Sequence, residues 1–485
     1  MARTITIDPV TRLEGHARIT LQLDDGGALV AARFHVTELR GFETFCVGRP
    51  FTEMTTLTAR ICGICPVSHL LCSARTGDKL LAVQPPPTAR GLRRLLNLAQ
   101  ICQSHALSFF YLSSADLLLG WNDDPDRRGI FGLIAADPDL ARAGIRLRQF
   151  GQTVIELLAG RRIHPGWVVP GGVRSALSPA ARAWILDHLP EARQTAALAL
   201  GRFKTLLDGP LQRDASRFGD LTSLFMALVA ADGRWECCEG SLRIVDSHGA
   251  IVGDGIREDA MPTLIGEAVE PWTRLKFPYL RSHGYPDGHY RVGPLARLNV
   301  CSGIGSPWAD REWLEFRQRA GAPVATCSFA YHHARLVEIV ACLEGIARLV
   351  DDDSLCRGRV RARAALNANE AIGVSEAPRG TLFHHYVVDD DGLISRVNLI
   401  IATGQNNLAM NHALAAVARE ELPWPLPAGV ELSARLLNRL EAAIRCYDPC
   451  LSCSTHAAGA MALQVQLLAG DGQLLAERRR DSGAP

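Results

Sequence analysis

The chain has 485 residues, of which 47% are hydrophobic and 21% are charged, and its formal net charge at pH 7 is +1. This length can bury a large core, arranged in roughly two to four domains or as one unusually large domain. Because the charge is nearly balanced, composition gives no electrostatic sign of a nucleic-acid or anionic-membrane partner. The partners and the function of this chain must therefore be inferred from particular motifs.

The N-terminal region predicts strands and carries no recognisable targeting segment. Residues 1–10, MARTITIDPV, lack the apolar stretch of a secretory signal, so we expect a cytoplasmic protein with reduced cysteines. Apolar and polar residues alternate in stretches between residues 4 and 38. The alternation breaks at residues 24–27, DDGG, which indicates two strands joined by a hairpin turn.

Helical periodicity dominates most of the remaining chain. It predicts helices at about 51–82, 88–120, 137–161, 179–209, 308–320, 327–351, 406–421 and 429–447. The longest uncharged run, residues 95–115, contains five polar side chains that a membrane interior would penalise: Asn97, Gln100, Gln103, Ser104 and His105. We therefore interpret this run as a buried helix and predict no membrane span.

Strand patterns fill the gaps between the helices. Short apolar runs punctuated by Gly and Pro occupy residues 220–305, and a strand pair with its turn at Asp389 to Gly392 occupies residues 381–403. No internal repeat or low-complexity linker divides the chain. We predict an α+β fold that is mostly α, with one large central bundle of long helices and small peripheral β-sheets.

The cysteines fall into two groups. Five lie in apolar surroundings near or within predicted helices and are expected to be small buried hydrophobic residues: Cys46, Cys72, Cys102, Cys342 and Cys446. Four others form two C-x-x-C pairs, in RICGICPVSH (60–69) and DPCLSCSTH (448–456). The gap between the pairs is far from the roughly 15–20 residues of a zinc ribbon, and neither pair has the βαβ context of a redox pair. Spacing alone leaves open one shared metal site, structural zinc and unrelated thiols.

The sequences around the two pairs narrow this choice. The segments DPVTRLEGH (8–16), RGFE (40–43), RICGICPVSH, EAPRG (376–380) and DPCLSCSTH occur in this order. With them, the chain closely resembles the large, catalytic subunit of nickel–iron hydrogenases from residue 3 to its end. In KFPYL (276–280), YRVGPLARLNV (290–300), VPGGV (169–173) and EAPRGTLFHHY (376–386) it looks most like the soluble bidirectional, NAD-linked branch.

The resemblance implies a nickel–iron centre held by the four paired cysteines. Cys62 and Cys450 would be terminal nickel ligands, and Cys65 and Cys453 would bridge nickel to an iron that carries CO and cyanide. Four thiolates form a soft, electron-rich donor set that suits a late first-row metal. By the same resemblance, Pro378 and Thr403 would contact the diatomic ligands on the iron.

The resemblance also assigns the surrounding catalytic residues. The sulfur of Cys450 would be the first proton acceptor, and Glu14 would be the next carboxylate in the proton relay. Arg379 would hold its charge over the vacant metal position, anchored by Asp448. His69 would be a hydrogen-bond donor beside the bridging sulfurs. The expected activity is the reversible heterolytic cleavage of H2 into protons and electrons.

A second metal and a processing step follow from the resemblance too. Glu43, His456 and the backbone carbonyl of Leu399 match a magnesium position. Residues 1–456 would then be a single catalytic domain, and residues 457–485 a C-terminal extension that a maturation endopeptidase removes after nickel insertion.

Two features of the sequence are not explained by the resemblance. Many respiratory members carry an acidic residue where this chain has Ser104, so the polar support of Arg379 is expected to be rearranged. No role could be assigned to four histidines: His332, His333, His384 and His385.

The electron route must involve other subunits. No strand–G-x-G-x-x-G–helix unit occurs, and SGIGSP (302–307) lacks the third glycine, so NAD must bind elsewhere. No cysteine cluster resembles iron–sulfur ligation, which predicts a small iron–sulfur subunit and a flavin and NAD module as partners. Alternatives are coupling to NADP, sulfur or a heterodisulfide partner, and the non-enzymatic alternatives are a hydrogen sensor or a nickel-free structural subunit. All four paired cysteines are kept, which argues against the structural subunit.

Overall fold

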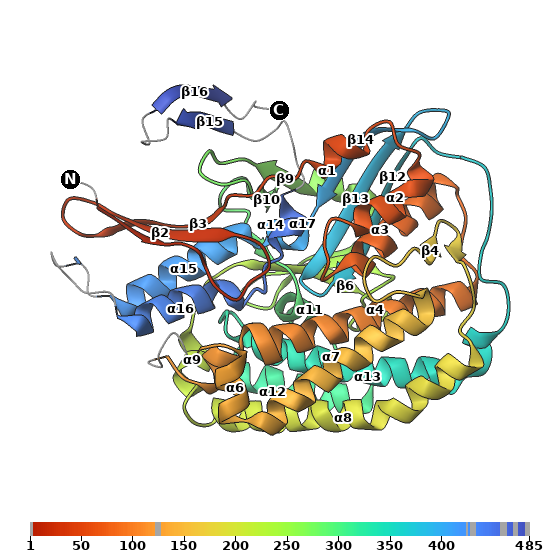
Figure 1. Cartoon of the computed structure of the whole chain (residues 1–485), viewed down its shortest axis with the longest axis horizontal. Coiled ribbons are helices and arrows are strands. Elements are labelled where there is room, and N and C mark those ends of the chain that lie inside the picture. The colour runs from red at the N-terminus through yellow and green to blue at the C-terminus, as the bar shows by residue number, and fades with distance from the viewer. Residues whose placement is uncertain are drawn as a thin grey trace.

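The computed structural model describes residues 3–121, 128–422, 425–426, 433–455, 463–468 and 474–480. Long helices lie side by side in one half of the molecule, and most of the strands lie in the other (Figure 1). The predicted α+β, mostly α class is confirmed.

The helical half is built on five long helices, which pack against one another in pairs. These are α4 (Pro87–Leu107), α7 (Pro138–Ala159), α8 (Pro179–Leu207), α12 (Pro307–Ala320) and α13 (Ala330–Asp351). Four of them begin with proline, which has no N–H to leave unsatisfied in the first turn. Two are also capped by a side chain, because Asp137 accepts a hydrogen bond from the Leu140 N–H and Ser178 accepts one from the Ala181 N–H.

The predicted run at 95–115 is buried, as expected, except at Tyr111 and Leu112. It spans the end of α4, a π-helix at Ser108–Leu112 and the start of α5 (Ser114–Leu118). Within the described part of the chain, no helix is both long and apolar enough to cross a bilayer. All 14 cysteines are free thiols, and burial raises the pKa of the Cys102 thiol to about 12.

Further helices of the described chain cover the strands and connect the five helices of the helical half. They are α1 (Phe42–Cys46), α2 (Met54–Ala59), α3 (Pro66–Leu80), α6 (Ile130–Ala136), α9 (Gln212–Arg217), α10 (Met261–Leu264), α11 (Pro294–Val300), α14 (Ala402–Gln405), α15 (Asn407–Glu421), α16 (Ala434–Arg445) and α17 (Leu451–Ser454). Short 3-10 turns occupy Phe51–Glu53, Glu258–Ala260 and Asp353–Cys356.

The strands form several small sheets. An antiparallel sheet of β1 (Arg3–Ile7), β2 (Ala17–Leu23) and β3 (Leu29–Val36) contains the predicted hairpin together with one further strand. A second antiparallel sheet has the order β12 (Glu370–Ala377), β13 (Gly380–Val388), β14 (Ile394–Ile400). A third has the order β11 (Tyr290–Arg291), β6 (Leu224–Val229), β7 (Ser241–Val245), β8 (Ile251–Ile256). Pairs are formed by β4 (Val168–Val169) with β5 (Gly172–Val173) and β9 (Ile265–Ala268) with β10 (Phe277–Leu280).

Two details differ from the sequence-based expectation. The helix expected at 51–82 is interrupted between Ala59 and Pro66, and the first C-x-x-C pair occupies the interruption. Strands β6 and β12 are buried on both faces, although we expected peripheral sheets, whereas β8 is largely exposed. Because β12 has no polar face, its sequence does not alternate and the pattern gave no strand signal.

The C-terminal part is described only as two strands. Strand β15 (Leu463–Leu468) pairs with β16 (Leu474–Arg480) in an antiparallel ladder of their own. His456 lies outside the described residues, so its expected role is not tested by this geometry.

Candidate metal centre

The first C-x-x-C pair lies in the loop between α2 and α3. Cys65 is the residue immediately before α3, and the N–H groups of Ile64 and Cys65 donate to the Cys62 sulfur at 3.2 and 3.3 Å. The side-chain amides of Gln100 and Gln103, on buried turns of α4, donate to the Ile64 carbonyl at 2.9 and 3.1 Å. The bundle thus holds this loop in one conformation.

The second pair lies at the start of α17. The Cys450 N–H donates to the Thr403 hydroxyl oxygen at 3.0 Å, and Cys453 lies within the short helix. The Thr403 hydroxyl accepts this bond through its oxygen, so its own hydrogen remains available to another group.

The two pairs meet in one buried cluster, although 388 positions separate Cys62 from Cys450. The sulfur atoms of Cys62 and Cys450 are 3.2 Å apart, those of Cys65 and Cys453 are 3.2 Å apart, and those of Cys450 and Cys453 are 3.0 Å apart. Each of the four residues is at most 4% exposed. The group of possible metal ligands consists of these four sulfurs alone, without a carboxylate or an imidazole. Such a donor set fits a soft transition metal such as nickel.

A small space of about 10 Å³ adjoins the sulfurs. Its walls are formed by Cys65, Ser68, His69, Ala377, Arg379, Leu382, Ile401, Ala402, Thr403, Cys450 and Cys453. Such a space admits about one water-sized group, so only a very small molecule fits beside the cluster. Pro378 is buried next to this wall, and its carbonyl accepts a hydrogen bond from Arg297 at 3.1 Å.

The thiols influence one another and the cations around them. Hydrogen bonds from Cys450, Cys453 and Cys65 lower the pKa of the Cys62 thiol well below its usual value. Burial raises the pKa of Cys450 and of Cys453. A cation bound at this cluster would favour deprotonation of the two thiols with raised pKa, Cys450 and Cys453.

Arg379 lies over the cluster and is fixed by Asp448. Its Nη2 donates to the Asp448 carboxylate at 3.0 Å, its Nε donates to the Asp448 backbone carbonyl, and its Nη1 lies 3.4 Å from the Ser104 hydroxyl. Burial lowers the pKa of Arg379, but Asp448 and the thiolates raise it by more, so the guanidinium stays charged. The Ser104 contact is long, so Asp448 provides most of the polar support of Arg379.

A buried ion cluster behind this segment was not identified from the sequence. Arg297 on α11 donates to both carboxylate oxygens of Glu338 at 2.5 and 2.6 Å and to Glu376 at 2.7 Å. It also donates to the carbonyls of Ala377 and Pro378. The segment that leads to Arg379 is therefore clamped by a fully buried arginine. The stretch YRVGPLARLNV contains this residue, and an arginine within the mostly apolar run GPLARLNV (293–300) was the available signal.

His69 on α3 connects the cluster to a chain of hydrogen bonds. Its Nε2 lies 3.5 Å from the Cys453 sulfur, and its Nδ1 lies 3.1 Å from His384 Nε2. His384 in turn lies 2.6 Å from the Tyr386 hydroxyl. His384 and Tyr386 are two residues apart on β13 and so share one face, a periodicity that could have indicated this partnership. His385 points the other way and contacts Glu370 at 2.6 Å.

Glu14 reaches the cluster from the loop between β1 and β2. It forms a backbone bridge with Cys450, and its carboxylate accepts hydrogen bonds from the Ser452 N–H at 2.9 Å and from the Ser452 hydroxyl. Gly15 makes this approach possible, because its φ is +91° and an added Cβ would lie 2.7 Å from the Leu451 Cβ. Glu14 is partly exposed, so its carboxylate lies between the buried sulfurs and the solvent.

The expected magnesium residues are only partly described. The Glu43 carboxylate accepts a hydrogen bond from the Leu399 N–H at 2.8 Å and lies 3.9 Å from the Lys276 ammonium. The carbonyl of Thr455 accepts a hydrogen bond from the Arg40 N–H at 2.8 Å. The structure thus brings Glu43 and Leu399 together. Thr455, the residue before His456, is bonded to Arg40, which lies three residues before Glu43.

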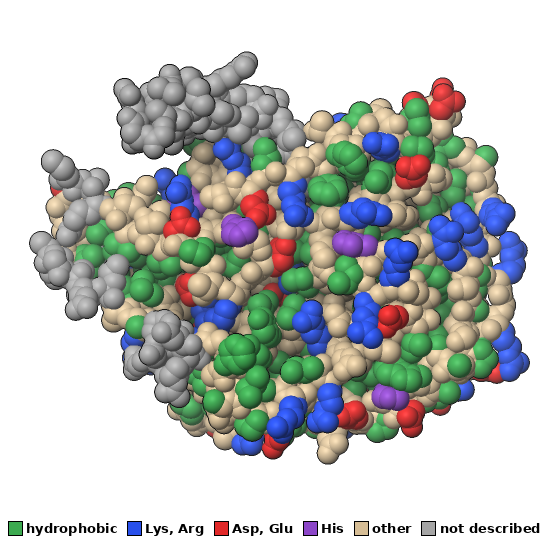
Figure 2. Space-filling model, viewed as in Figure 1, with side chains coloured by type: hydrophobic (Ala, Val, Ile, Leu, Met, Phe, Trp, Pro, Cys, Tyr) green, Lys and Arg blue, Asp and Glu red, His purple; other side chains and the backbone are tan. Residues whose placement is uncertain are grey.

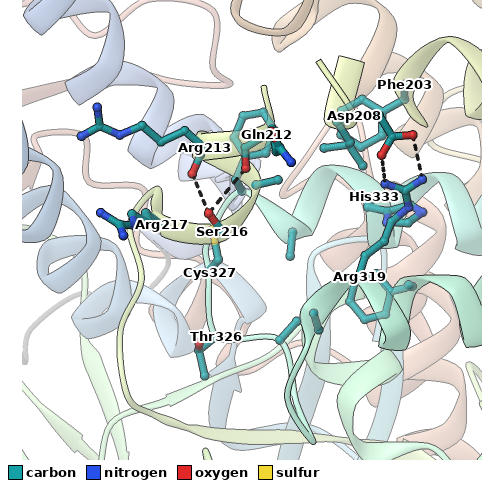
Figure 3. Close-up of a pocket in the computed structure, with 17 residues that line it drawn as sticks. Phe203, Asp208, Gln212, Arg213, Ser216, Arg217, Arg319, Thr326, Cys327 and His333 are labelled. Atoms are coloured by element: carbon teal, nitrogen blue, oxygen red, sulfur yellow. Dashed lines mark hydrogen bonds and ion pairs between the residues drawn. The ribbon is translucent and has the colours of Figure 1, made fainter. Parts of the chain in front are cut away.

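The remaining histidines lie away from the thiol cluster. His332 and His333 are buried on α13, and burial lowers the pKa of each to about 3. His333 lines a cavity of about 880 Å³ between the ends of α8, α9 and α12 (Figure 3). In this view Asp208 pairs with Arg319 on one wall, and Arg213 and Arg217 lie on the other. Larger volume does not make this cavity the reaction site, because its walls contain none of the residues around the four thiols.

Comparison with known proteins agrees with the geometry. A family model described as HoxL-like matches residues 4–39, and the model of nickel-dependent hydrogenases matches residues 40–121 and 262–456. The fold and the buried four-thiol site define a metalloenzyme, and this chain belongs to the nickel-dependent hydrogenase family. Within that family it is a large, catalytic subunit, an oxidoreductase that acts on H2.

Two relatives and two solved structures illustrate the likeness. The chain is 38% identical to the NAD-reducing hydrogenase HoxS subunit beta of Cupriavidus necator, over 99% of this chain and 100% of the relative. It is 38% identical to the vhc subunit of an F420-non-reducing hydrogenase of Methanococcus voltae, over 94% and 95%. The crystal structure of an NAD+-reducing [NiFe]-hydrogenase matches with a TM-score of 0.89 and 45% identity, over 94% of this chain and 99% of that chain. A Ni-Fe-Se hydrogenase of D. vulgaris Hildenborough, at 23% identity and a TM-score of 0.73 over 94% and 100%, shows the fold alone.

Proposed function

We propose that this chain is the hydrogen-cleaving subunit of an NAD-reducing hydrogenase, which passes electrons through an iron–sulfur subunit to a flavin and NAD module on partner chains. The observation that carries the proposal is the buried cluster of Cys62, Cys65, Cys450 and Cys453 under Arg379. The 45% identity to an NAD+-reducing hydrogenase of known structure favours NAD over NADP, sulfur or a heterodisulfide as the acceptor. A cytoplasmic location belongs to the same proposal, because NAD is an intracellular cofactor.

A second acceptor class has specific support. The F420-non-reducing hydrogenase of M. voltae has a subunit that is as similar in sequence, at 38% identity, as the subunit of C. necator. Coupling to a different partner complex is therefore the alternative. A nickel-free structural subunit is disfavoured, since all four thiols converge on one site.

The residues that would hold the metals follow from the cluster. Cys62, Cys65, Cys450 and Cys453 would together hold nickel and an iron that carries CO and cyanide ligands. When bound, this pair supplies the acceptor for the hydride half of H2. Thr403 is positioned to donate its free hydroxyl hydrogen toward such ligands, and Pro378 would provide apolar contact beside them.

The chain's own residues would then handle the proton. The Cys450 sulfur accepts it, and Glu14, bridged to Cys450 through the backbone and bonded to Ser452, carries it toward the solvent. Arg379 polarises the small molecule in the adjoining space, because a fixed guanidinium in a dry site needs no reorganisation during the reaction. His69 donates toward the Cys453 sulfur, and His384 orients that donor.

A magnesium ion would lie beside this proton route. The Glu43 carboxylate accepts a hydrogen bond from the Leu399 N–H, and Glu43 and the Leu399 carbonyl would supply the hard oxygen ligands that magnesium prefers. The Thr455 carbonyl, bonded to Arg40, brings the chain to this region one residue before His456. These contacts support the assignment of Glu43, Leu399 and His456 as the magnesium residues.

Removal of residues 457–485 by a maturation endopeptidase is the last part of the proposal. The hydrogenase family model matches this chain up to residue 456. The match to the NAD+-reducing hydrogenase structure covers 99% of that chain but only 94% of this chain, so part of this chain has no counterpart in that structure. The match to the C. necator subunit covers 99% of this chain. The extension carries three consecutive arginines, residues 478–480, which could not be buried unpaired near the cluster. Intact-mass measurement of the nickel-containing enzyme tests this: the mature chain should end at His456, and a chain that still ends at Pro485 would contradict it.

The metal assignment is tested by comparing two cysteine substitutions in the complex purified with its partners. Cys450→Ser should lose most of the nickel and all NAD-dependent hydrogen uptake. Cys356→Ser, a partly exposed free thiol outside the cluster, should keep both. If Cys450→Ser retained parental nickel and activity, the assignment would fail. If zinc filled the parental site in a fully matured preparation, the structural-zinc alternative would be right instead.

A further inference from the structure

A second group of thiols lies in the loop between β6 and β7. Cys237 is fully buried and Cys238 is partly exposed, and their sulfur atoms are 3.7 Å apart. They are adjacent in the sequence and belong to none of the hydrogenase motifs. Together with Glu236 they form the second group of metal-type ligands within the described residues.

The Glu236 carboxylate is already engaged, which argues against a metal ion. Its Oε1 accepts hydrogen bonds from the N–H groups of Cys237, Cys238 and Glu239 at 2.8, 2.7 and 3.2 Å. Its Oε2 accepts a hydrogen bond from Arg94 at 2.9 Å. Glu236 therefore fixes the loop through these three N–H groups and keeps the two thiols close together.

The two thiols differ in reactivity. A hydrogen bond from Cys237 lowers the pKa of the Cys238 thiol, and the nearby Arg94 lowers it further, while the same contact raises the pKa of Cys237. The Asn97 amide lies 3.7 Å from the Cys238 sulfur and can donate to its thiolate. The more acidic thiol is thus the partly exposed one, and the less acidic thiol lies behind it.

We propose that Cys237 and Cys238 form a reversible oxidation site, at which a low-molecular-weight disulfide such as glutathione disulfide converts the pair into an internal disulfide. The Cys238 thiolate attacks a sulfur of the small disulfide, which forms a mixed disulfide and releases one small thiol. Cys237 then attacks the Cys238 sulfur and releases the second small thiol. Two protein S–H bonds and one S–S bond break, one protein S–S bond and two small-molecule S–H bonds form, and two electrons leave the protein.

The geometry makes this disulfide easy to reduce again. Consecutive Cα atoms are about 3.8 Å apart across a trans peptide, below the roughly 4.4–6.8 Å usual for disulfides. Ring closure therefore distorts the loop, and a distorted disulfide has a more oxidising potential. The site should stay reduced in a reducing cytosol and respond only when the thiol pool becomes oxidised.

The cysteine pair lies against the strand that leads to Arg379. The Cys237 carbonyl accepts hydrogen bonds from the Asn97 amide at 2.8 Å and from the Glu376 N–H at 3.3 Å. Glu376 is the β12 residue that Arg297 clamps, three positions before Arg379.

Mass spectrometry of one tryptic peptide tests the proposal. Cleavage after Arg234 and Arg243 releases residues 235–243, WECCEGSLR, which contains these two cysteines and no other. The purified complex is equilibrated without oxygen in buffers of graded glutathione to glutathione disulfide ratio, and free thiols are then blocked in denaturant before digestion. A form lighter by two hydrogens than the dithiol peptide should grow as the disulfide share rises, and it should disappear in excess glutathione.

Matched variants make the result specific. Cys238→Ser should abolish the lighter peptide and leave Cys237 as a blocked thiol without a glutathione adduct, whereas Cys356→Ser, at another partly exposed thiol, should leave the lighter peptide unchanged. The proposal is wrong if the peptide carries two blocked thiols at every ratio, or if it carries only a glutathione adduct. A metal ion found bound to this loop in the complex would also overturn it.

Discussion

The planar guanidinium of Arg379 donates hydrogen bonds to both the carboxylate and the backbone carbonyl of Asp448. Asp448 itself has a left-handed φ of 51°, an uncommon conformation for a side-chain-bearing residue that presents both acceptors to one partner. A lysine would keep the charge but could not make both contacts in one plane.

Arg379→Lys should therefore lower turnover by roughly 100- to 1,000-fold, the range seen when one preorganised electrostatic group is removed. Nickel and iron contents should stay near parental values, since the substitution leaves the four thiols in place. Steady-state hydrogen uptake and metal analysis on the same samples measure both quantities. Arg142→Lys, in an exposed pair, is the control and should have no effect. A decrease of less than about threefold would place Arg379 outside the reaction site, at odds with that range.

Glu14→Gln tests the proton route. The amide preserves the size of the side chain and can still bond to Ser452, but it cannot carry a proton as a carboxylate does. The variant should keep its metals and lose most of the hydrogen–deuterium exchange activity. Glu53→Gln on the exposed 3-10 turn is the matched control. Exchange at the parental rate in Glu14→Gln would mean that protons leave by another path.

At the scale of elements, one carboxylate joins the segments that carry the site. Asp116 on α5 pairs with Arg12 at 2.7 Å, Arg128 at 2.6 Å and Arg445 at 2.7 Å. Arg12 lies two residues before Glu14, and Arg445 ends the helix that leads to Cys450. Burial raises the pKa of Asp116, but Arg445 and Arg12 lower it by more, to well below its usual range. The N-terminal loop and the C-terminal cysteine pair thus share one anchor.

Asp116→Asn should destabilise the protein by roughly 3–5 kcal/mol, the cost of leaving buried charges without their partner. Hydrogen uptake should fall as well, because the loops that carry Glu14 and Cys450 lose their common anchor. Thermal unfolding and activity measure the two effects. Asp139→Asn, whose side chain is 86% exposed in an ion pair with Arg142, should change neither. A variant with parental stability would show that the arginines do not depend on Asp116.

At the scale of the whole molecule, charges of both signs are mixed on the surface, and the largely apolar interior also holds some titratable side chains. Basic, acidic and apolar side chains are interspersed across much of the face in Figure 2, in keeping with the net charge of +1. The interior instead contains neutral histidines. Burial lowers the pKa of His105 to about 4 and the pKa of His332 and His333 to about 3.

These histidines predict how stability depends on pH. An unfolded histidine binds a proton near pH 6.5, whereas the folded one stays neutral to about pH 3–4, so the unfolded state binds more protons in between. Their contribution is complete above about pH 6.5 and is lost as the pH falls, by at most about 1.4 kcal/mol per pH unit for each histidine. Denaturant unfolding of the enzyme between pH 7 and pH 4.5 measures the slope.

A histidine in apolar surroundings provides the matched comparison. The His333 ring contacts Phe203 and Phe316, and its Nε2 has no hydrogen-bond partner in the described structure. His333→Phe should reduce the slope by about one histidine's contribution, about 1.4 kcal/mol per pH unit. His16→Gln, with a side chain that is 78% exposed, should leave the slope unchanged. Equal slopes in His333→Phe and the parent would show that His333 is protonated in the folded state.

Much of the fold and part of the site could be predicted from the sequence. The helices α7, α8, α12 and α13 lie close to their predicted ranges, because helical periodicity and starting prolines are local signals. The helix predicted at 88–120 instead ends as α4 at Leu107 and is followed by a π-helix and α5. The break between Ala59 and Pro66 was missed, since the loop is held open by Gln100 and Gln103 from a different helix. Strand β12 was missed because burial on both faces removed its alternation.

The sequence by itself determined the chemistry: the four thiols, the arginine and the carboxylate are residue types at fixed local spacings, and a missing dinucleotide motif is equally local. Only the tertiary structure decided which groups support them. The pairing of His384 with His69, the anchoring of Arg379 on a backbone carbonyl and the burial of Arg297 between two carboxylates join residues 41–315 positions apart. Such contacts depend on how distant elements pack, because the energy of a buried polar group is set by the partner that packing brings to it.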